Sequence, residues 1–232
     1  MTQPTIPERV THSASVPMAE PPRAEPPRAE LPSIEALLAW VREPLIAAAR
    51  GRARRDGLFG RRVRITARPT LPIPEHATVV RGGEVRTLQQ WPAIPGGLQA
   101  GDHVVVQVGT VPEDRERYVR WLHALARHDL PRISIAPCSR TASGLHPLWC
   151  IAAARLCLPA HVAIEARHDL LGIRLAQVAL GFGADTIAGP IEPDRNLPLC
   201  GVTRPDENTA SGLATLVRHA GLSPAHDPET TR

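Results

Sequence analysis

Residues 146–191 read HPLWCIAAARLCLPAHVAIEARHDLLGIRLAQVALGFGADTIAGPI, and this stretch decides the fold class. Apolar and β-like runs alternate along it at lengths typical of buried helices and short strands. The runs predict two helices and two strands: helices over residues 147–158 and 172–182, strands over residues 161–166 and 185–188. Strands that alternate with helices of this length predict βαβ units and a parallel sheet.

The same alternation extends toward the N-terminus and closes with one more helix. Ser33 is a suitable N-cap for the first helix, and Pro44 opens the second. The further predicted elements are strands at 62–67, 77–80, 102–108 and 132–137, and helices at 34–41, 45–55, 112–128 and 211–220. About six strands suffice for a small or partial parallel (βα) barrel, and an open doubly wound sheet is the alternative.

The chain divides into a tail, one α/β domain and a short end. Residues 1–32 are rich in proline, alanine and charge, and PPRAE occurs twice in tandem at residues 21–30. Such a segment buries too little apolar surface to offset its ordering entropy, so we expect it to be disordered. The folded domain is expected over residues 33–222, followed by a flexible C-terminus at 223–232.

Composition narrows the function classes. No stretch approaches the roughly 20 consecutive apolar residues that span a bilayer, and the N-terminus lacks the pattern of a secretory signal. We therefore expect a cytoplasmic protein without a membrane partner. The formal net charge is +4 and every basic residue is arginine, but the aromatic content is 3%, too little for stacking platforms that bind nucleic acid.

The densest arginine cluster lies between residues 50 and 64. We interpret it as a solvated helix face and strand edge rather than a nucleic-acid site. Its members are Arg50, Arg52, Arg54, Arg55, Arg61, Arg62 and Arg64.

The four cysteines and ten histidines lack metal-ligand spacing. Cys150 and Cys157 lie in an apolar segment and are expected to be buried small hydrophobes. Cys138 and Cys200 are far from other cysteines in the chain. We therefore expect no metal site and, in the cytoplasm, no disulfide.

Three segments carry a family resemblance: IAAARL at 151–156, LAQVALGFGADTIAG at 175–189 and LATLVRHAGLSP at 213–224. They resemble the late barrel and the "LIREAGxxP" ending of the radical S-adenosylmethionine enzymes of the futalosine route to menaquinone. These are aminofutalosine synthase and dehypoxanthine futalosine cyclase, which are related to the deazaflavin-cofactor (FO) synthase. Residues 34–68 are more weakly similar to the family's opening helices and first strand. The resemblance implies a partial barrel of about six strands derived from a radical barrel.

The chain departs from this family at the positions that carry its chemistry. The family's CxxxCxxC motif follows the first strand and holds a [4Fe–4S] cluster, but residues 69–76 read PTLPIPEH without a cysteine. The second aspartate and the threonine of the family's GADD-x-x-GT segment are replaced by Thr186 and Pro190. The chain is also far shorter than the family. We therefore expect no cluster, no S-adenosylmethionine binding and no radical chemistry.

Ligands in parallel α/β folds bind at the carboxyl ends of the strands. The residues that we place there are Gln107, Cys138, Ser139, Arg140, Glu165, His168, Asp169 and Asp185. A pocket that joins Arg140, Glu165 and His168 could bind a carboxylate or a ribose and perform acid–base chemistry. We take Arg140, Glu165, His168 and Asp185 as the candidate substrate-binding residues, with the catalytic residues unknown. His103 opens a strand and is interpreted as a strand-edge residue.

Three functions follow from these observations. The favoured one is a degenerate, cluster-less homologue of the futalosine enzymes that binds a ligand or assembles with an active paralogue or with a second copy of itself. The second is an enzyme that uses strand-end acid–base residues on a nucleoside-like or carboxylate substrate. The third is an interaction module that recruits a partner through the PPRAE tail.

Overall fold

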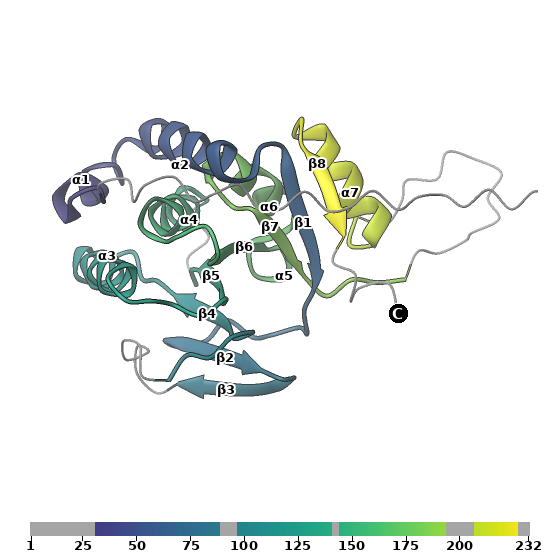
Figure 1. Ribbon diagram of the computed structural model, residues 1–232, viewed down its shortest axis with the longest axis horizontal. Coiled ribbons are helices and arrows are strands. Elements are labelled where there is room, and N and C mark those ends of the chain that lie inside the picture. The colour runs from purple at the N-terminus through teal and green to yellow at the C-terminus, as the bar shows by residue number, and fades with distance from the viewer. Residues whose placement is uncertain (1–30, 89–96, 141–143, 194–206, 227–232) are drawn as a thin grey trace, which may run out of the picture.

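The computed structural model describes residues 31–88, 97–140, 144–193 and 207–226, and alternating helices and strands make up most of this part of the chain (Figure 1). The helices are α1 (Ile34–Ala39), α2 (Pro44–Phe59), α3 (Pro112–Ala126), α4 (Leu145–Cys157), α5 (His168–Leu171), α6 (Ile173–Ala179), the 3₁₀ turn η1 (Leu180–Phe182) and α7 (Ala210–His219). The strands are β1 (Arg62–Ala67), β2 (Ala77–Arg81), β3 (Glu84–Leu88), β4 (His103–Gln107), β5 (Ser134–Cys138), β6 (Ala163–Arg167), β7 (Thr186–Gly189) and β8 (Ser223–His226).

The strands form one mostly parallel sheet of eight strands in the order β3-β2-β4-β5-β6-β7-β1-β8. All neighbours from β4 to β8 run parallel, while β2 is antiparallel to both β3 and β4. The predicted α/β class with a mostly parallel sheet is confirmed. The six predicted strands all form, but β3 and β8 add to them, and a closed barrel is not confirmed because β3 and β8 are the end strands of this order.

The connection from β1 to β2 crosses one face of the sheet, because these two strands lie near opposite edges. Arg68 N donates to Gly189 O (2.8 Å) at the end of β7, and Gln107 N at the end of β4 donates to His76 O (2.8 Å). Between these points, Leu71 packs on this face in a small apolar cluster with Val80, Val105, Ala136, Cys138 and Leu170. We call residues 68–76 the crossing segment.

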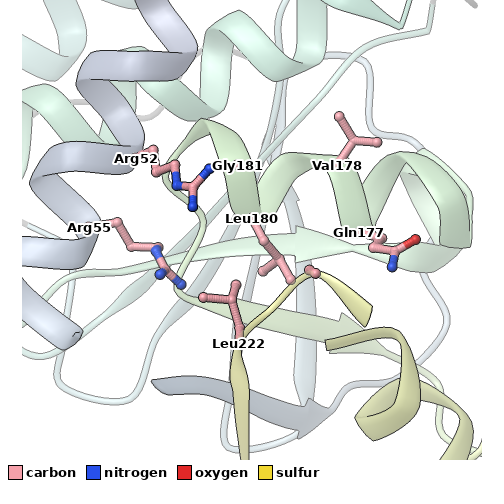
Figure 2. Close-up of a pocket in the computed structure, with 8 residues that line it drawn as sticks. Arg52, Arg55, Gln177, Val178, Leu180, Gly181 and Leu222 are labelled. Atoms are coloured by element: carbon pink, nitrogen blue, oxygen red, sulfur yellow. The ribbon is translucent and has the colours of Figure 1, made fainter. Parts of the chain in front are cut away.

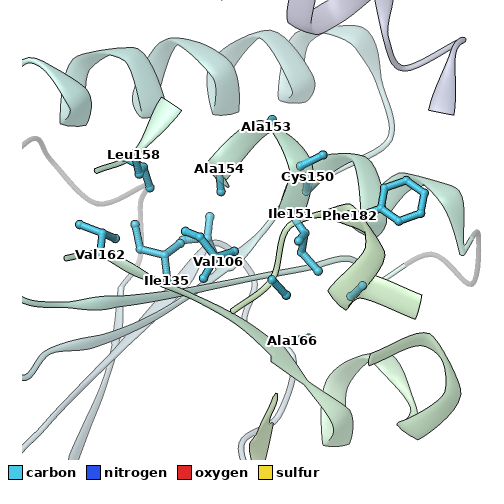
Figure 3. Close-up of a cluster of buried hydrophobic side chains, with 14 of the residues drawn as sticks. Val106, Ile135, Cys150, Ile151, Ala153, Ala154, Leu158, Val162, Ala166 and Phe182 are labelled. Atoms are coloured by element: carbon cyan, nitrogen blue, oxygen red, sulfur yellow. The ribbon is translucent and has the colours of Figure 1, made fainter. Parts of the chain in front are cut away.

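The main core fills the space between the other face of the sheet and the helices. Figure 3 shows Ile151 and Ala154 of α4 above Val106 of β4 and Ile135 of β5. Helix α2 approaches this layer so closely that a Cβ on Gly51 would lie 2.2 Å from the Phe182 carbonyl oxygen. Glycine is therefore required where α2 crosses η1.

Buried polar groups of the helices find backbone acceptors. Trp149 Nε1 donates to Leu37 O (2.9 Å), which ties α4 to α1. The Tyr118 hydroxyl donates to Cys150 O (2.9 Å), which ties α3 to α4. These bonds satisfy donors that would otherwise be buried without a partner.

Two expectations about the chain ends can be compared with the fold. Ser33 is confirmed as the N-cap of α1, since Ser33 Oγ accepts from Ala36 N (3.1 Å). Residues 223–226, expected to belong to a flexible end, instead form β8 alongside β1. Of the expected disordered tail at residues 1–32, residues 1–30 lie outside the described part of the chain, and so do the last residues, 227–232. Within that part, none of the helices is long and apolar enough to cross a membrane.

Candidate functional site

One face of the sheet carries a row of buried polar side chains. Successive residues of a strand point to opposite faces, and Val104 and Val106 of β4 pack into the main core with α4. His103 of β4 and Glu165 of β6 lie on the opposite face, which the crossing segment spans. We call this face the polar face.

Glu165 is the centre of a charged network on the polar face. The network combines a carboxylate, a histidine and an arginine, of which Glu165 and His103 are each 1% exposed and Arg68 is 26% exposed. Arg68 Nη2 donates to Glu165 Oε1 (2.7 Å), and His103 Nδ1 lies 3.2 Å from Glu165 Oε2. Burial opposes ionisation of Glu165, but His103 and Arg68 more than offset that effect, so the pKa of this carboxyl lies below its ordinary value.

His103 is neutral in this network, and its neighbours fix its tautomer. Burial lowers the pKa of His103 to about 4, despite the nearby Glu165 carboxylate. Arg167 Nη1 donates to His103 Nε2 (3.0 Å), because a guanidinium has no acceptor atom. The proton therefore sits on Nδ1, where Ser134 Oγ (2.9 Å) and Glu165 are the neighbouring oxygen atoms.

Arg167 joins the network to the crossing segment. Its Nε and Nη2 donate to the two carboxylate oxygens of Asp169 (3.0 and 2.6 Å), and Nη2 also donates to Pro69 O (2.6 Å). Two arginines, Arg68 and Arg167, thus face two carboxylates. The network is neutral overall and holds the first residues of the crossing segment against the polar face.

Two nitrogen atoms at the carboxyl edge of the sheet have no hydrogen-bond partner. Arg68 Nε and His168 Nε2 are both buried without one. They are neighbours through Gly189, since Arg68 N donates to its carbonyl and the His168 ring packs on its Cα. A Cβ on Gly189 would lie 2.5 Å from His168 Nε2, and its φ is +144°. Burial lowers the pKa of His168, so its ring is neutral near pH 7.

The structure brings only part of the predicted pocket together. Glu165 and His168 both lie on or beside β6 and are linked through Arg68 and Gly189. Arg140 follows β5, is exposed, and makes no hydrogen bond or ion pair to either residue in the described structure. The predicted pocket of Arg140, Glu165 and His168 therefore does not form as a contact among all three side chains.

Asp185 does not lie at a carboxyl end, and that prediction was wrong. It immediately precedes β7, at the amino edge of the sheet, and is 2% exposed. Its carboxylate binds the fully buried Arg155 of α4, accepts from Arg64 Nη2 (3.0 Å) and accepts from Ile164 N (2.9 Å). These contacts fasten α4, β1 and β6 to β7, which is a structural role.

Sequence reasoning missed three members of the network: Arg68, His103 and Arg167. His103 was interpreted as a strand-edge residue, but it is fully buried between β5, β6 and the crossing segment. The alternation in His103-Val104-Val105-Val106 was the available signal, because it places His103 on the face opposite the helices. The register that aligns β4 with β6 through β5 is not visible in the sequence.

The three cysteines in the described part of the chain are buried, and Cys138 lies near the Arg167–Asp169 ion pair. Cys138, Cys150 and Cys157 are buried free thiols, while Cys200 lies outside the described residues. Burial raises the pKa of Cys138 and of Cys157 to about 12, so both are protonated at neutral pH. Among the described residues, no group of three histidine, cysteine or acidic side chains is arranged to hold a metal ion.

The crossing segment does not fit an iron–sulfur cluster. It supplies no thiolate, and thiolates are the ligands that hold such clusters. Leu71 from this segment packs instead into the apolar cluster on the polar face. In comparisons with known proteins, no family model matches the chain and no curated protein sequence is significantly similar to it.

Proposed function

We propose that this chain is a non-radical binding or accessory protein linked to menaquinone biosynthesis, descended from the barrel of the futalosine-pathway radical enzymes. Its ligand is a small nucleoside-like or carboxylate molecule bound at the carboxyl edge of β1, β6 and β7. The observation that carries this proposal is the pair of unpartnered nitrogen atoms, Arg68 Nε and His168 Nε2, beside Gly189. A carboxylate or ribose oxygen would accept from Arg68 Nε, and a ribose hydroxyl can pair with His168 Nε2 in either tautomer.

Descent from a barrel is supported by the position of β1. In a closed parallel barrel, the first strand pairs with the last. Here β1 pairs in parallel with β7, the last strand of the βαβ series, with Arg64 opposite Thr186. The resemblance in sequence covers this same series, from α4 to β7.

Binding is favoured over acid–base catalysis by His103 because Arg167 already donates to its Nε2. Arg68 donates to Glu165 Oε1, while Glu165 Oε2 is buried without a hydrogen-bond partner, 3.2 Å from His103 Nδ1. A base whose lone pair already accepts from a guanidinium cannot accept a proton from a substrate. Glu165 and His103 therefore serve to hold Arg68 and Arg167 in place.

A ligand titration with a matched pair of histidine variants tests the binding site. Inosine and benzoate are the probes for a nucleoside and a carboxylate, and the readout is calorimetry on the full chain. His168→Phe removes the unpartnered nitrogen and keeps a ring, so we expect it to weaken binding about tenfold, which corresponds to about 1.4 kcal/mol. His161→Phe, at an exposed position, is the control. Equal affinity in both variants would refute the site.

Two further experiments test the accessory role. Anaerobic reconstitution with iron and sulfide is expected to give no stoichiometric 4Fe–4S absorbance. Copurification with an active futalosine-pathway enzyme is expected, and a self-associated chain without that enzyme would favour a homodimer. Deletion of residues 1–31 tests the interaction-module alternative, since loss of partner capture would assign recruitment to the PPRAE tail.

An acid–base enzyme is the second candidate, favoured by the Glu165–His103 contact itself. A substrate whose oxygen atoms drew Arg167 away would free His103 Nε2, with Glu165 stabilising the imidazolium. Hydrolysis of inosine with release of its base, abolished in His103→Gln, would establish this function in place of simple binding.

A further inference from the structure

A pocket of about 240 Å³ lies among the helices, on the side of the sheet opposite the polar face. Its walls come from α2, from α6 and η1, and from the turn between α7 and β8. Figure 2 shows Arg52 and Arg55 of α2 on one side, with Leu180 and Leu222 nearby and Gln177 across from them. This pocket is separate from the site of the proposed function.

Arg55 gives the pocket a buried donor without an acceptor. The side chain is 1% exposed, and its guanidinium binds the Asp56 carboxylate and donates to Gly60 O (3.1 Å). Arg55 Nη1 is buried and has no partner. Figure 2 shows this guanidinium turned toward Leu222. A buried guanidinium nitrogen that lacks an acceptor is an unsatisfied group that a bound anion would satisfy.

The charges around the pocket leave one positive charge uncompensated. Arg52 Nε lies 3.5 Å from the Asp56 carboxylate that also binds Arg55. Two guanidinium groups therefore share one acidic partner. A single negative charge would balance the group, and a planar carboxylate matches the donor fork of arginine.

Most of the other side chains that line the pocket are apolar. Leu180, Leu222, Val178 and Ala220 line the pocket, and its volume equals that of roughly eight water molecules at about 30 Å³ each. Gln177 Nε2 donates to Leu216 O (2.9 Å), so the amide at the far end is held in place. An inorganic anion would leave these apolar side chains in contact with water.

We infer that this pocket binds a small monocarboxylate with an apolar body. The carboxylate accepts from Arg55 and Arg52, and the hydrocarbon part packs on Leu180 and Leu222. Three features coincide here: a cavity, the buried Arg55 side chain whose Nη1 has no acceptor, and an apolar wall.

Titration of the full chain with hexanoate at pH 7 tests the inference, with inorganic phosphate in parallel. Heteronuclear NMR is the readout because it locates the site. We expect saturable hexanoate binding with shifts centred on residues 180–183 and 222, and much weaker binding of phosphate. The absence of saturable hexanoate binding, or shifts centred on Gly189 instead, would overturn the inference. Equal affinity for phosphate would overturn the apolar-body assignment.

Two glycine variants separate pocket occupancy from folding. A Cβ on either Gly181 or Gly57 meets nothing within 4 Å, but only Gly181 lines the pocket. Gly181→Leu is expected to fill the pocket and weaken hexanoate binding at least about tenfold, while Gly57→Leu on α2 leaves it unchanged. Equal weakening, or none, in the two variants would refute the pocket as the site.

Arginine variants test the charge. Arg52 is largely exposed, so Arg52→Gln is expected to fold normally and to weaken hexanoate binding several-fold. Arg55→Met is expected to abolish binding, with thermal unfolding checked alongside it. Unchanged affinity in Arg52→Gln would show that the carboxylate does not lie between the two guanidinium groups.

Discussion

Two groups of buried charges lie at opposite edges of the sheet and differ in how completely their carboxylates are satisfied. At the amino edge, the Asp185 carboxylate binds Arg155 and Arg64 and accepts from Ile164 N and from Thr186 Oγ1; only Arg155 Nη1 of this group is buried without a partner. Toward the carboxyl edge, Glu165 Oε1 accepts from Arg68, but Glu165 Oε2 and Arg68 Nε have no hydrogen-bond partner. The amino-edge group holds elements together, while the carboxyl-edge group also has an unpartnered acceptor and donor, at the edge where ligands bind in parallel sheets.

The largest expected effect is the loss of the amino-edge group. Asp185→Asn removes the only acidic partner that the described structure gives the fully buried Arg155. An uncompensated buried charge costs about 3–5 kcal/mol, so we expect the free energy of unfolding in urea to fall by that amount. Asp129→Asn, at an exposed position on the same protein, is the control and should change it by less than about 0.5 kcal/mol. If Asp185→Asn lowers the unfolding free energy by less than Glu165→Gln does, the carboxyl-edge group contributes more to stability than the amino-edge group.

The second effect is a pH dependence that originates in His103. The pKa of His103 is about 4 in the folded protein against an ordinary value of 6.5, so only the unfolded chain takes up this proton between those limits. The stability contributed by neutral His103 is full above pH 6.5 and falls by roughly 3 kcal/mol as the pH drops to about 4.

His103→Asn isolates this contribution from the other histidines. Burial also lowers the pKa values of His123, His146 and His168, but these histidines are present in both proteins, so their contribution is the same in wild type and variant. We expect the unfolding free energy of His103→Asn to depend less steeply on pH between 6.5 and 4. Parallel curves for the two proteins would show that His103 is protonated in the fold.

A smaller effect is expected for Glu165→Gln, because Arg68 is partly exposed and water can replace the lost carboxylate. We expect a loss of about 2 kcal/mol in unfolding free energy, measured by urea denaturation. Glu116→Gln, which breaks the exposed pair with Arg120 on α3, is the matched control and should cost less than about 0.5 kcal/mol. Equal losses in the two variants would mean that the Glu165 network adds no more than a surface ion pair.

The smallest effect on stability is expected for His168→Phe. The variant loses the hydrogen bond between His168 and the Pro190 backbone, but Nε2 has no partner to lose and the new ring keeps the packing on Gly189. The free energy of unfolding should fall by about 1 kcal/mol, while ligand affinity falls as described above. A loss of stability like that of Glu165→Gln would place His168 in the structural network rather than at the ligand site.

The fold was predictable wherever hydrophobic periodicity carries the information. The alternation of apolar helix and strand runs located all six central strands. Strand β3, Glu84–Leu88, was missed because its exposed residues lack an apolar face, although Gly82 and Gly83, with φ of 55° and 87°, form the turn that pairs it with β2. Strand β8 was missed because its pairing depends on the backbone of β1 rather than on its own side chains.

The site was less predictable than the fold because it depends on strand register. The sequence identified Glu165 and His168, which lie on one strand end. Arg68 is 97 residues from Glu165 in the chain, and His103 is 64 residues from Arg167. Neither contact can be inferred without knowing that β1 lies beside β7 and that β4 lies two strands from β6.

The position of β1 also constrains how the chain folds. Its two neighbours, β7 and β8, both come late in the sequence, and Arg64 is 121 residues from its partner Asp185. A chain emerging from the ribosome has therefore made β1 long before either neighbour exists, and the closure of such long loops slows folding. Until then the strand presents two unpaired edges, which makes it the segment most exposed to mispairing during synthesis.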